Sequence, residues 1–308
     1  MRSKQAGVLL LGEALVDEFA DQHVAGGAPF NVARHLAAIG VPALLASRIG
    51  LDDAGGQLVR ASMKRFGLSE QGLQLDQQHP TGRVSVIEAG GAHRFEIHAD
   101  AAWDHLDGAV LPNLLIQQEP DFVYFGSLAQ RHPVARASLR SLLALAGEQQ
   151  RLRYLDLNLR EGSSSAELAE ASLHLADWVK VNQDELALLL DWFDAGQAPD
   201  GVAGLMLRFE LQLLVVTRGE QGYAAFDAQG QQIASGSGIA VEHLADTVGA
   251  GDGFSAMLLA ATLAGQPLPM ALDLANRYAS ALCSQRGPVP ADDGFFKSWQ
   301  SALKTNSG

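Results

Sequence analysis

The stretch Ala245-Asp246-Thr247-Val248-Gly249-Ala250-Gly251-Asp252-Gly253-Phe254 constrains both the fold and the chemistry of this sequence. Glycine tolerates positive φ and close backbone approach, so residues 249–251 can form a concave turn. A long apolar run, Ser255 to Leu263, comes next and predicts a helix. If the helix begins at the turn, its first amides have no intrahelical partners and form a site for an anion. We therefore expect an anion hole with Asp252 at its mouth.

Asp252 is oddly placed for anion binding alone, because a carboxylate repels a phosphate. Its position suits a general base beside a transferring phosphoryl group. The alternative is an ordinary glycine-rich turn capped by an aspartate. The segment is not a Walker P-loop, since no Gly-Lys-Ser/Thr follows it.

The composition is that of a globular chain that can bury a large core. Its 308 residues are 47% hydrophobic and 19% charged. The net charge of -13 disfavours nucleic acid or an anionic membrane as a partner. The single Cys283 excludes an intramolecular disulfide framework and a cysteine-based zinc site. The nine histidines never occur as His-Glu-x-x-His, which argues against a zinc hydrolase.

The N-terminal apolar run, Gly7 to Leu11, is too short for a signal peptide, and Glu13 and Asp17 interrupt its continuation. No stretch approaches the roughly 18–20 apolar residues of a membrane span. We expect a cytoplasmic protein with no membrane partner.

The apolar segments alternate between strand-like and helix-like patterns. We expect a first strand over Gly7 to Asp17 and a helix to Ile39, with Pro29 in its first turn and Gly40 at its end. Further strands are expected at 44–49, 122–125, 154–157, 178–181 and 213–217, and further helices at 57–66, 133–146 and 166–175. This βαβ alternation predicts one α/β domain over 1–308, with a doubly wound, mostly parallel sheet that binds ligands at the strand C-termini.

The segment Gly82 to Asp100 differs from the rest of the chain. Val84 and Val86, then Phe95 and Ile97, alternate with polar residues around Gly90-Gly91. This pattern predicts a hairpin with one solvated face, outside the buried parallel sheet.

Polar residues follow several of the predicted strands, so their side chains should meet at one edge of the sheet. The clusters are Asp17, Asp156 to Arg160, Asn182 to Glu185, and Thr217 to Glu220. Each could alone be a helix cap or a solvated loop. Arg160 could supply the cation that phosphoryl transfer needs, and Asn182 with Glu185 could order a hydrated Mg²⁺.

Taken together, these motifs resemble the ribokinase-like, PfkB-type carbohydrate kinases. The C-terminal signature of that family, Asp-Thr-x-Gly-Ala-Gly-Asp, matches Asp246 to Asp252 at every fixed position. Gly26, Gly27 and Asn31 match the paired glycines and helical asparagine of the N-terminal signature. The intervening clusters agree in order, so the match spans roughly 250 residues.

The resemblance implies ATP-dependent phosphorylation of a sugar hydroxyl, with Mg²⁺ and with K⁺ as in several members. It implies that Asp252 is the base and that the amides of Gly249, Ala250 and Gly251 form the anion hole. Asp17, Gly27 and Asn31 would hold the sugar, and Thr217, Gly219 and Asn276 the nucleotide. Asp246 and the Val248 carbonyl would border the K⁺ site. The residues near 18–25 and 82–100 would form a small β lid, through which a homodimer could also form.

Within the family, Gly-Gly-Ala-Pro at 26–29 resembles the fructokinase branch, because ribokinases usually carry lysine where Ala28 stands. The sequence Asp156-Leu157-Asn158-Leu159-Arg160 resembles the Asp-Pro-Asn-x-Arg of fructokinases and ketodeoxygluconate kinases, with Leu157 replacing proline. We expect fructose, with 2-keto-3-deoxygluconate or ribosides as alternatives.

A non-catalytic sugar-binding regulator would have lost the base, the anion hole or the arginine, and this chain keeps all three. A dinucleotide-dependent oxidoreductase lacks support, because no Gly-x-Gly-x-x-Gly follows the first strand.

Overall fold

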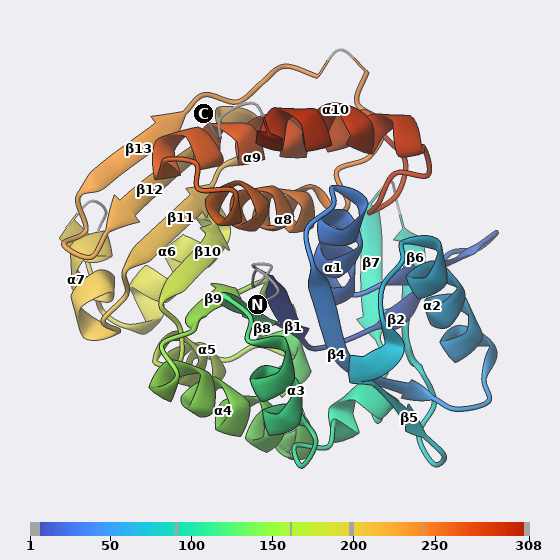
Figure 1. Cartoon of the computed structure of the whole chain (residues 1–308). Coiled ribbons are helices and arrows are strands. Elements are labelled where there is room, and N and C mark those ends of the chain that lie inside the picture. The colour runs from blue at the N-terminus through green and yellow to red at the C-terminus, as the bar shows by residue number, and fades with distance from the viewer. Residues whose placement is uncertain (1–6, 90–91, 161, 197–199, 242, 305–308) are drawn as a thin grey trace, which may run out of the picture.

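The structure is a computed structural model that describes residues 7–89, 92–160, 162–196, 200–241 and 243–304. Its centre is a nine-stranded sheet (Figure 1). In spatial order the strands are β13 (Gln232–Gly236), β12 (Tyr223–Asp227), β11 (Leu213–Thr217), β10 (Trp178–Asn182), β9 (Leu152–Asp156), β8 (Phe122–Gly126), β1 (Val8–Leu11), β4 (Ala43–Gly50) and β5 (Leu73–Asp76). The strands from β11 to β5 are parallel, and β12 and β13 add an antiparallel edge. The predicted fold class is confirmed.

Both faces of the sheet are buried, which explains why its strands read as continuous apolar runs. In β1, Leu9 and Leu11 join one hydrophobic core, whereas Val8 and Leu10 join the other. All four side chains are at most 2% exposed. The alternation of side chains along a strand thus builds two cores from one sheet.

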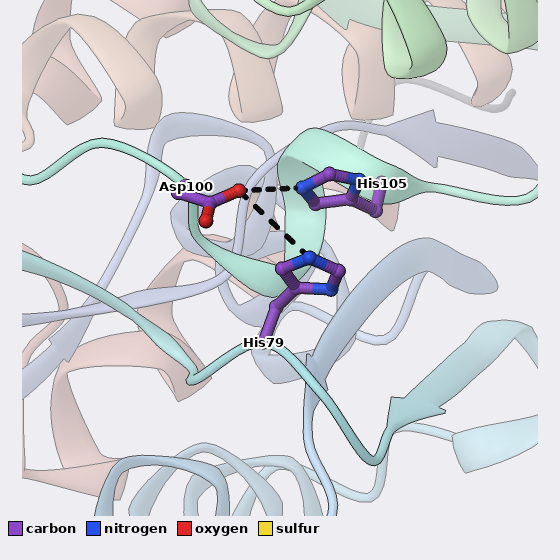
Figure 2. A group of neighbouring side chains, drawn as sticks. All are labelled: His79, Asp100 and His105. Atoms are coloured by element: carbon purple, nitrogen blue, oxygen red, sulfur yellow. Dashed lines mark hydrogen bonds and ion pairs between the residues drawn. The ribbon is translucent and has the colours of Figure 1, made fainter.

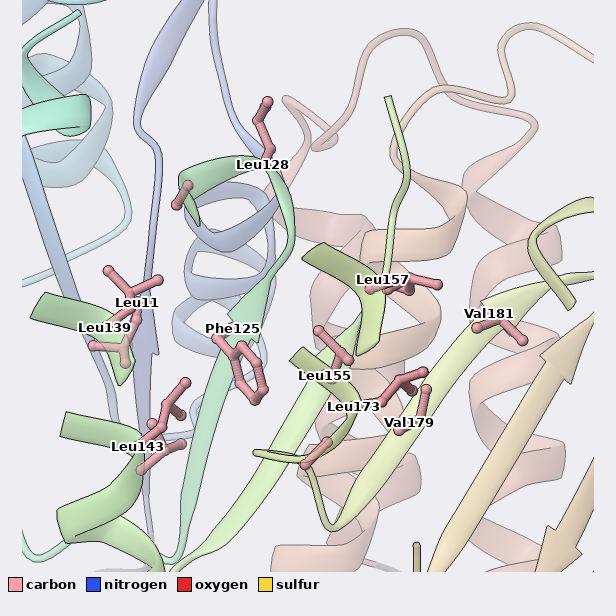
Figure 3. Packing of buried hydrophobic residues seen from close by; sticks show 14 of the residues in the cluster. Leu11, Phe125, Leu128, Leu139, Leu143, Leu155, Leu157, Leu173, Val179 and Val181 are labelled. Atoms are coloured by element: carbon pink, nitrogen blue, oxygen red, sulfur yellow. The ribbon is translucent and has the colours of Figure 1, made fainter. Parts of the chain in front are cut away.

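Helices cover the two faces as separate layers. One face carries α3 (Leu111–Gln118), α4 (Pro133–Glu148), α5 (Ala166–Leu173), α6 (Gln183–Trp192) and α7 (Asp200–Arg208). The other face carries α1 (Ala28–Ala38), α8 (Ala250–Leu263), α9 (Leu268–Leu282) and α10 (Asp293–Lys304), while α2 (Ala54–Arg65) packs against β4 and a second, smaller sheet. Short 3₁₀ turns are η1 (Glu70–Gly72), η2 (Ala102–His105), η3 (Leu128–Gln130) and η4 (Gly219–Gln221). Figure 3 shows the first core, where strand residues such as Phe125, Leu155 and Val179 pack with Leu139 and Leu173 of the helices.

The small sheet lies beside the main one and consists of β3 (His23–Gly26), β2 (Leu15–Glu18), β6 (Gly82–Ala89) and β7 (Ala92–Ile97), in that spatial order. The β6–β7 pair is the predicted hairpin, and β2 runs parallel to β6 and antiparallel to β3. Gly90 and Gly91, expected at its turn, lie outside the described residues.

The predicted strand from Gly7 to Asp17 is wrong in its second half. The strand β1 ends at Leu11, and Gly12 has a φ of 145°. A Cβ at Gly12 would lie 2.7 Å from Cγ of Pro29, so this turn requires glycine. The chain crosses there to the small sheet. Asp17 therefore belongs to β2 rather than to the end of a core strand.

The other polar strand ends do converge on one edge of the main sheet. Asp156 at the end of β9 is paired in register with Lys180, and Asn182 at the end of β10 is paired with Thr217 at the end of β11. No helix in the described part of the chain has the length and apolar character needed to cross a membrane.

Candidate active site

The N-terminus of α8 forms an open turn at the same edge of the main sheet. Gly249 has a φ of 80°, and a Cβ there would lie 2.5 Å from the carbonyl oxygen of Pro288. The Ala250 amide donates to the Thr247 carbonyl at 3.3 Å. The amides of Gly251 and Asp252 donate to no carbonyl in the described part of the chain. These two amides are thus available to an anion.

Asp252 lies in the first turn of α8 and contacts α1 directly. Nδ2 of Asn31 donates a hydrogen bond of 2.7 Å to Oδ2 of Asp252. The other end of the Asn31 side chain accepts from Arg34, whose guanidinium also donates to the Ala25 carbonyl at 2.8 Å. Asn31 is therefore held in one orientation by a buried arginine, and its amide NH₂ faces the carboxylate.

The surroundings of Asp252 favour its protonated form. Burial, and after it the negative charge of Asp156, raises the pKa of Asp252 to about 6. The hydrogen bond from Asn31 and the positive charges of Lys180 and Arg160 act in the opposite direction. A carboxyl with a pKa near 6 can accept a proton at neutral pH more readily than an ordinary aspartate.

A buried ion pair lies behind this turn. Nζ of Lys180 contacts Oδ1 of Asp156 at 2.7 Å, and the two residues are 6% and 2% exposed. Ser255 donates to Oδ2 of Asp156 at 2.8 Å, and Tyr154 donates to Ser255 at 3.1 Å. A Cβ at Gly251 would lie 3.5 Å from Nζ of Lys180, which brings this ammonium close to the turn. Lys180 was not among the predicted site residues, although a lysine in the middle of an apolar strand is a usable signal.

Glu13, like Lys180, is a site residue that was not predicted from the sequence. It is 3% exposed, and its Oε1 accepts from the Ala28 amide at 3.2 Å. Its Oε2 is buried and has no partner among the described residues. Burial raises the pKa of Glu13 to about 7, against the hydrogen bond from Ala28 and the charge of Arg160, while Asp252 adds a smaller rise.

The paired glycines pack tightly against these acids. Gly27 has a φ of 107°, and a Cβ there would lie 2.5 Å from the carbonyl oxygen of Glu13. The Asp17 carboxylate lies directly over the Cβ position of Gly26. Burial raises the pKa of Asp17 to about 6, opposed by the charges of Arg34 and then Arg160.

Arg160 is exposed and follows β9 in the segment before α5. Its amide donates to Oγ of Ser164 at 2.8 Å, which fixes the backbone. Its positive charge lowers the pKa of three carboxyls, Glu13, Asp17 and Asp252. The structure therefore brings together most of the predicted catalytic and sugar-side residues around one acidic cluster, which consists of Glu13, Asp17 and Asp252.

A cleft on the other side of the α8 turn contains several of the residues predicted to bind the nucleotide. Its volume is about 150 Å³, and it is lined by Thr217, Gly219, Gly222, Ala250, Gly251, Phe254, Asn276, Ala279, Ser280 and Cys283. Nδ2 of Asn276 donates to the Ser237 carbonyl at 2.9 Å. Because Ala250 and Gly251 line it, the cleft reaches the open amides at the start of α8.

Asn182 and Glu185, predicted as magnesium residues, together cap α6. Oδ1 of Asn182 accepts from the Glu185 amide at 2.8 Å, and Oε2 of Glu185 accepts from the Asn182 amide at 2.8 Å. Oε1 of Glu185 accepts from the Leu159 amide at 2.7 Å, which fixes the backbone next to Arg160. These contacts are those of a capping box.

Asp246, predicted to border a cation site, holds the loop before α8. Its Oδ1 accepts from the Val248 amide at 3.0 Å, and its Oδ2 accepts from the Gly287 amide at 3.1 Å. Val248 is 43% exposed. Asp246 therefore fixes the approach of the chain to Gly249 through these two hydrogen bonds.

Comparisons with known proteins agree with this site and fold. Residues 8–293 match the pfkB family of carbohydrate kinases. Fructokinase-1 from Oryza sativa is 29% identical over 296 residues, which cover 91% of this chain and 88% of the rice protein. An uncharacterized sugar kinase from Pyrococcus horikoshii has a solved structure with a TM-score of 0.80, at 25% identity over 97% of this chain and 99% of that one.

A fructokinase from Vibrio cholerae, solved with fructose, ADP and calcium ion, has a TM-score of 0.79 at 25% identity, over 96% of this chain and 99% of that one. Another form of that enzyme, a double mutant, was solved with fructose, ADP and potassium ion. The family match covers most of the chain, and this protein therefore belongs to the PfkB family of carbohydrate kinases. It is an ATP-dependent sugar kinase.

Proposed function

We propose that this kinase phosphorylates D-fructose on its terminal hydroxyl, with Asp252 as the general base. One observation carries the proposal. A carboxyl whose pKa is about 6 lies in the first turn of α8, beside the open amides of that helix. The amides attract a phosphate, and the carboxylate accepts the proton that the hydroxyl loses when it attacks.

The anion hole stabilises charge that develops on the transferring phosphoryl group. The helix N-terminus is oriented before the reaction, so its amides need no reorganisation as the charge develops. We assign this role to the turn of Gly249, Ala250 and Gly251. In the described part of the chain the amides of Gly249, Gly251 and Asp252 donate to no carbonyl, whereas that of Ala250 donates to Thr247. Arg160 would supply a positive charge on the sugar side, since its charge already acts on Asp252.

On the sugar side, Asp17, Gly27 and Asn31 would hold hydroxyl groups. Asp17 and Asn31 have polar atoms near the acidic cluster, and Gly27 lets the backbone approach closely. Ala28 removes the lysine expected of a ribose kinase. The relatives named fructokinase, at 26–29% identity, support fructose over the other sugars.

On the nucleotide side, Thr217, Gly219 and Asn276 would bind ATP in the cleft beside α8. Mg²⁺ bound with ATP would offset the negative charge of the phosphates. The oxygen atoms of Asn182 and Glu185 suit Mg²⁺ in kind, but they are already engaged in the cap of α6. We therefore propose that they act through water molecules in the hydration shell of the ion, which Mg²⁺ commonly retains.

Two further roles are proposed, one for the loop before α8 and one for the small sheet. Asp246 and the Val248 carbonyl would border a K⁺ site, by analogy with the potassium form of the Vibrio cholerae enzyme. The small sheet would act as a lid over the sugar, and a homodimer would form through it.

A screen of sugars tests the substrate. ADP formation is coupled to a spectroscopic readout with ATP and Mg²⁺, and kcat/KM is compared for fructose, ribose, 2-keto-3-deoxygluconate and a nucleoside. A polar pocket loses about 1–3 kcal/mol for each buried partner left unpaired, so fructose should stand clear of the others. If ketodeoxygluconate or the nucleoside is better by tenfold or more, fructose is the wrong substrate while the kinase activity stands.

A further inference from the structure

His79, Asp100 and His105 form a cluster remote in sequence from every residue assigned to catalysis (Figure 2). His79 lies between β5 and β6, Asp100 follows β7, and His105 ends η2. One possible metal-ligating atom from each of these three side chains lies within 4.8 Å of the other two. Two segments that join the small sheet to the rest of the protein therefore meet at a set of nitrogen and oxygen donors.

The geometry is close to that of a metal site. Oδ1 of Asp100 lies 2.8 Å from Nε2 of His105 and 3.8 Å from Nε2 of His79. An ion bound tetrahedrally at about 2.0–2.2 Å holds its ligand atoms roughly 3.3–3.6 Å apart. A side-chain shift of about an ångström, together with a tilt of one imidazole, would reach that spacing. The Asp100 side chain is 72% exposed, so the carboxylate has room to rotate.

The orientation of His79 is fixed by a second carboxylate, as in many metal sites. Nδ1 of His79 lies 3.0 Å from Oδ2 of Asp76. Asp76 is itself held by the amides of Gln78 and His79, at 2.7 and 2.9 Å, and by an ion pair with Arg48 at 2.7 Å. With its proton on Nδ1, His79 presents the lone pair of Nε2 toward Asp100 and His105. Asp76 is 3% exposed, so this support is part of the fold.

The two imidazoles are stacked face to face, and Nε2 of each faces the carboxylate of Asp100. Because the lone pair of Nε2 lies in the plane of its ring, one ring must tilt out of this stack before both can bind the same ion. The ring centroids of His79 and His105 are 3.6 Å apart, with an angle of 13° between the planes. The ring of His132, at the start of α4, lies 4.7 Å from that of His105. His132 is not one of the three donor residues, so a fourth ligand would come from water.

We propose that His79, Asp100 and His105 bind one transition-metal dication of the Zn²⁺ type. Imidazole nitrogen with one carboxylate suits Zn²⁺, Co²⁺ or Ni²⁺, whereas Mg²⁺ and Ca²⁺ prefer oxygen ligands. The ion would join the segment entering β6 to the segment leaving β7. It would thereby restrict movement of the β6–β7 hairpin relative to the main sheet, separately from the chemistry at Asp252.

The binding experiment uses tag-free, full-length protein treated with a chelator and studied without nucleotide. Zn²⁺ is titrated by calorimetry, and Co²⁺ by visible absorption. Wild type should bind one equivalent of each, with Co²⁺ bands typical of a tetrahedral or five-coordinate site.

Asp100→Asn and His105→Gln should each weaken binding at least tenfold. Asp100 has a φ of 56°, which asparagine tolerates well, so the first variant keeps the backbone. His174→Gln, a change at an exposed histidine on another part of the surface, should bind as wild type does.

Two results would overturn the proposal. One is the absence of saturable binding at one equivalent in wild type, and the other is equal affinity in wild type, Asp100→Asn and His105→Gln.

The effect on the hairpin is measured by amide hydrogen exchange of residues 82–89 and 92–97. Exchange should slow when Zn²⁺ is added to wild type and should not change in Asp100→Asn. Unchanged exchange in Zn²⁺-bound wild type would refute the tethering role.

Discussion

Asn31 and Asp252 lie 221 residues apart in the sequence, and the amide of the first donates a hydrogen bond of 2.7 Å to the carboxylate of the second. This contact joins the start of α1, next to the paired glycines, to the start of α8, next to the open amides. Asn31, which we propose to hold the sugar, therefore contacts Asp252, which we propose to deprotonate the sugar hydroxyl. One hydrogen bond can then both position the base and adjust its pKa.

The first prediction concerns the base itself. Asp252→Asn keeps the size of the side chain but cannot accept the hydroxyl proton, so kcat should fall by roughly 10²–10⁴. Nucleotide affinity, measured by calorimetry, should change little. Asp191→Asn, on the exposed face of α6, serves as the matched control and should have wild-type kinetics. Turnover of the Asp252 variant within a few-fold of wild type would remove this residue from the mechanism.

The second prediction is the pH dependence of kcat/KM. If Asp252 is the base it must be ionised, so activity should fall as the pH drops through about 6, the value to which burial raises its pKa. Asn31 donates to the charged carboxylate and so lowers this pKa. Asn31→Ala should therefore move the acidic limb of the profile to higher pH, in addition to raising KM for the sugar. A profile with the same acidic limb in both enzymes would show that Asp252 is not the group that titrates.

The third prediction concerns Arg160. If Arg160 stabilises the transferring phosphoryl group as proposed, Arg160→Ala should lower kcat/KM by more than the ~1 kcal/mol typical of an exposed salt bridge. Arg151→Ala, a change at an arginine outside the acidic cluster, is a useful comparison. Equal kinetics for Arg160→Ala and wild type would mean that Arg160 is a solvated surface residue.

Local sequence patterns predicted much of the fold and the edge of the site. The glycines at 249–251 and the apolar run after them indicated the turn and α8, and the βαβ alternation indicated the parallel sheet. The break at Gly12 was missed, because only the contact with Pro29, distant in sequence, shows why the strand stops there. The antiparallel edge formed by β12 and β13 was also missed, as were α9 and α10.

The contacts within the site were less predictable than the residue types. Glu13 looked like an interruption of an apolar run, and its unpartnered Oε2 becomes visible only when the chain is folded. Lys180 carried a signal, a charge within a buried strand, but its partner Asp156 lies on the neighbouring strand. Pairing between strands depends on register, which the sequence of one strand does not specify.

The fourth prediction is a response to monovalent cations. If Asp246 and the Val248 carbonyl hold K⁺, potassium should raise kcat relative to a buffer with only a bulky organic cation. Asp246→Ala should abolish that response. The variant should also loosen the loop before Gly249, since Asp246 accepts from the amides of Val248 and Gly287. Equal wild-type rates in the two buffers would leave Asp246 with the structural role alone.

The last prediction uses the pKa of Glu13 to separate stability from catalysis. The folded state raises this pKa from 4.5 to about 7, so the folded protein binds a proton that the unfolded chain releases. The unfolded state thus holds fewer protons between these two values, and the free energy of unfolding falls as the pH rises through this range. The cost above pH 7 is at most roughly 3 kcal/mol.

Glu13→Gln removes this cost, because glutamine stays neutral and its carbonyl can still accept from the Ala28 amide. Urea unfolding should show the variant to be more stable than wild type at about pH 8 and equal to it near pH 4.5, the pKa of the unfolded chain. Glu148→Gln, at an exposed position, should show no such difference. At pH 6, where Asp252 titrates, a Glu13 with a pKa of about 7 is mostly protonated and neutral, so the acidic limb of kcat/KM should stay close to that of wild type in Glu13→Gln. A variant that loses stability at both pH values would show that Glu13 is ionised and paired in the folded protein.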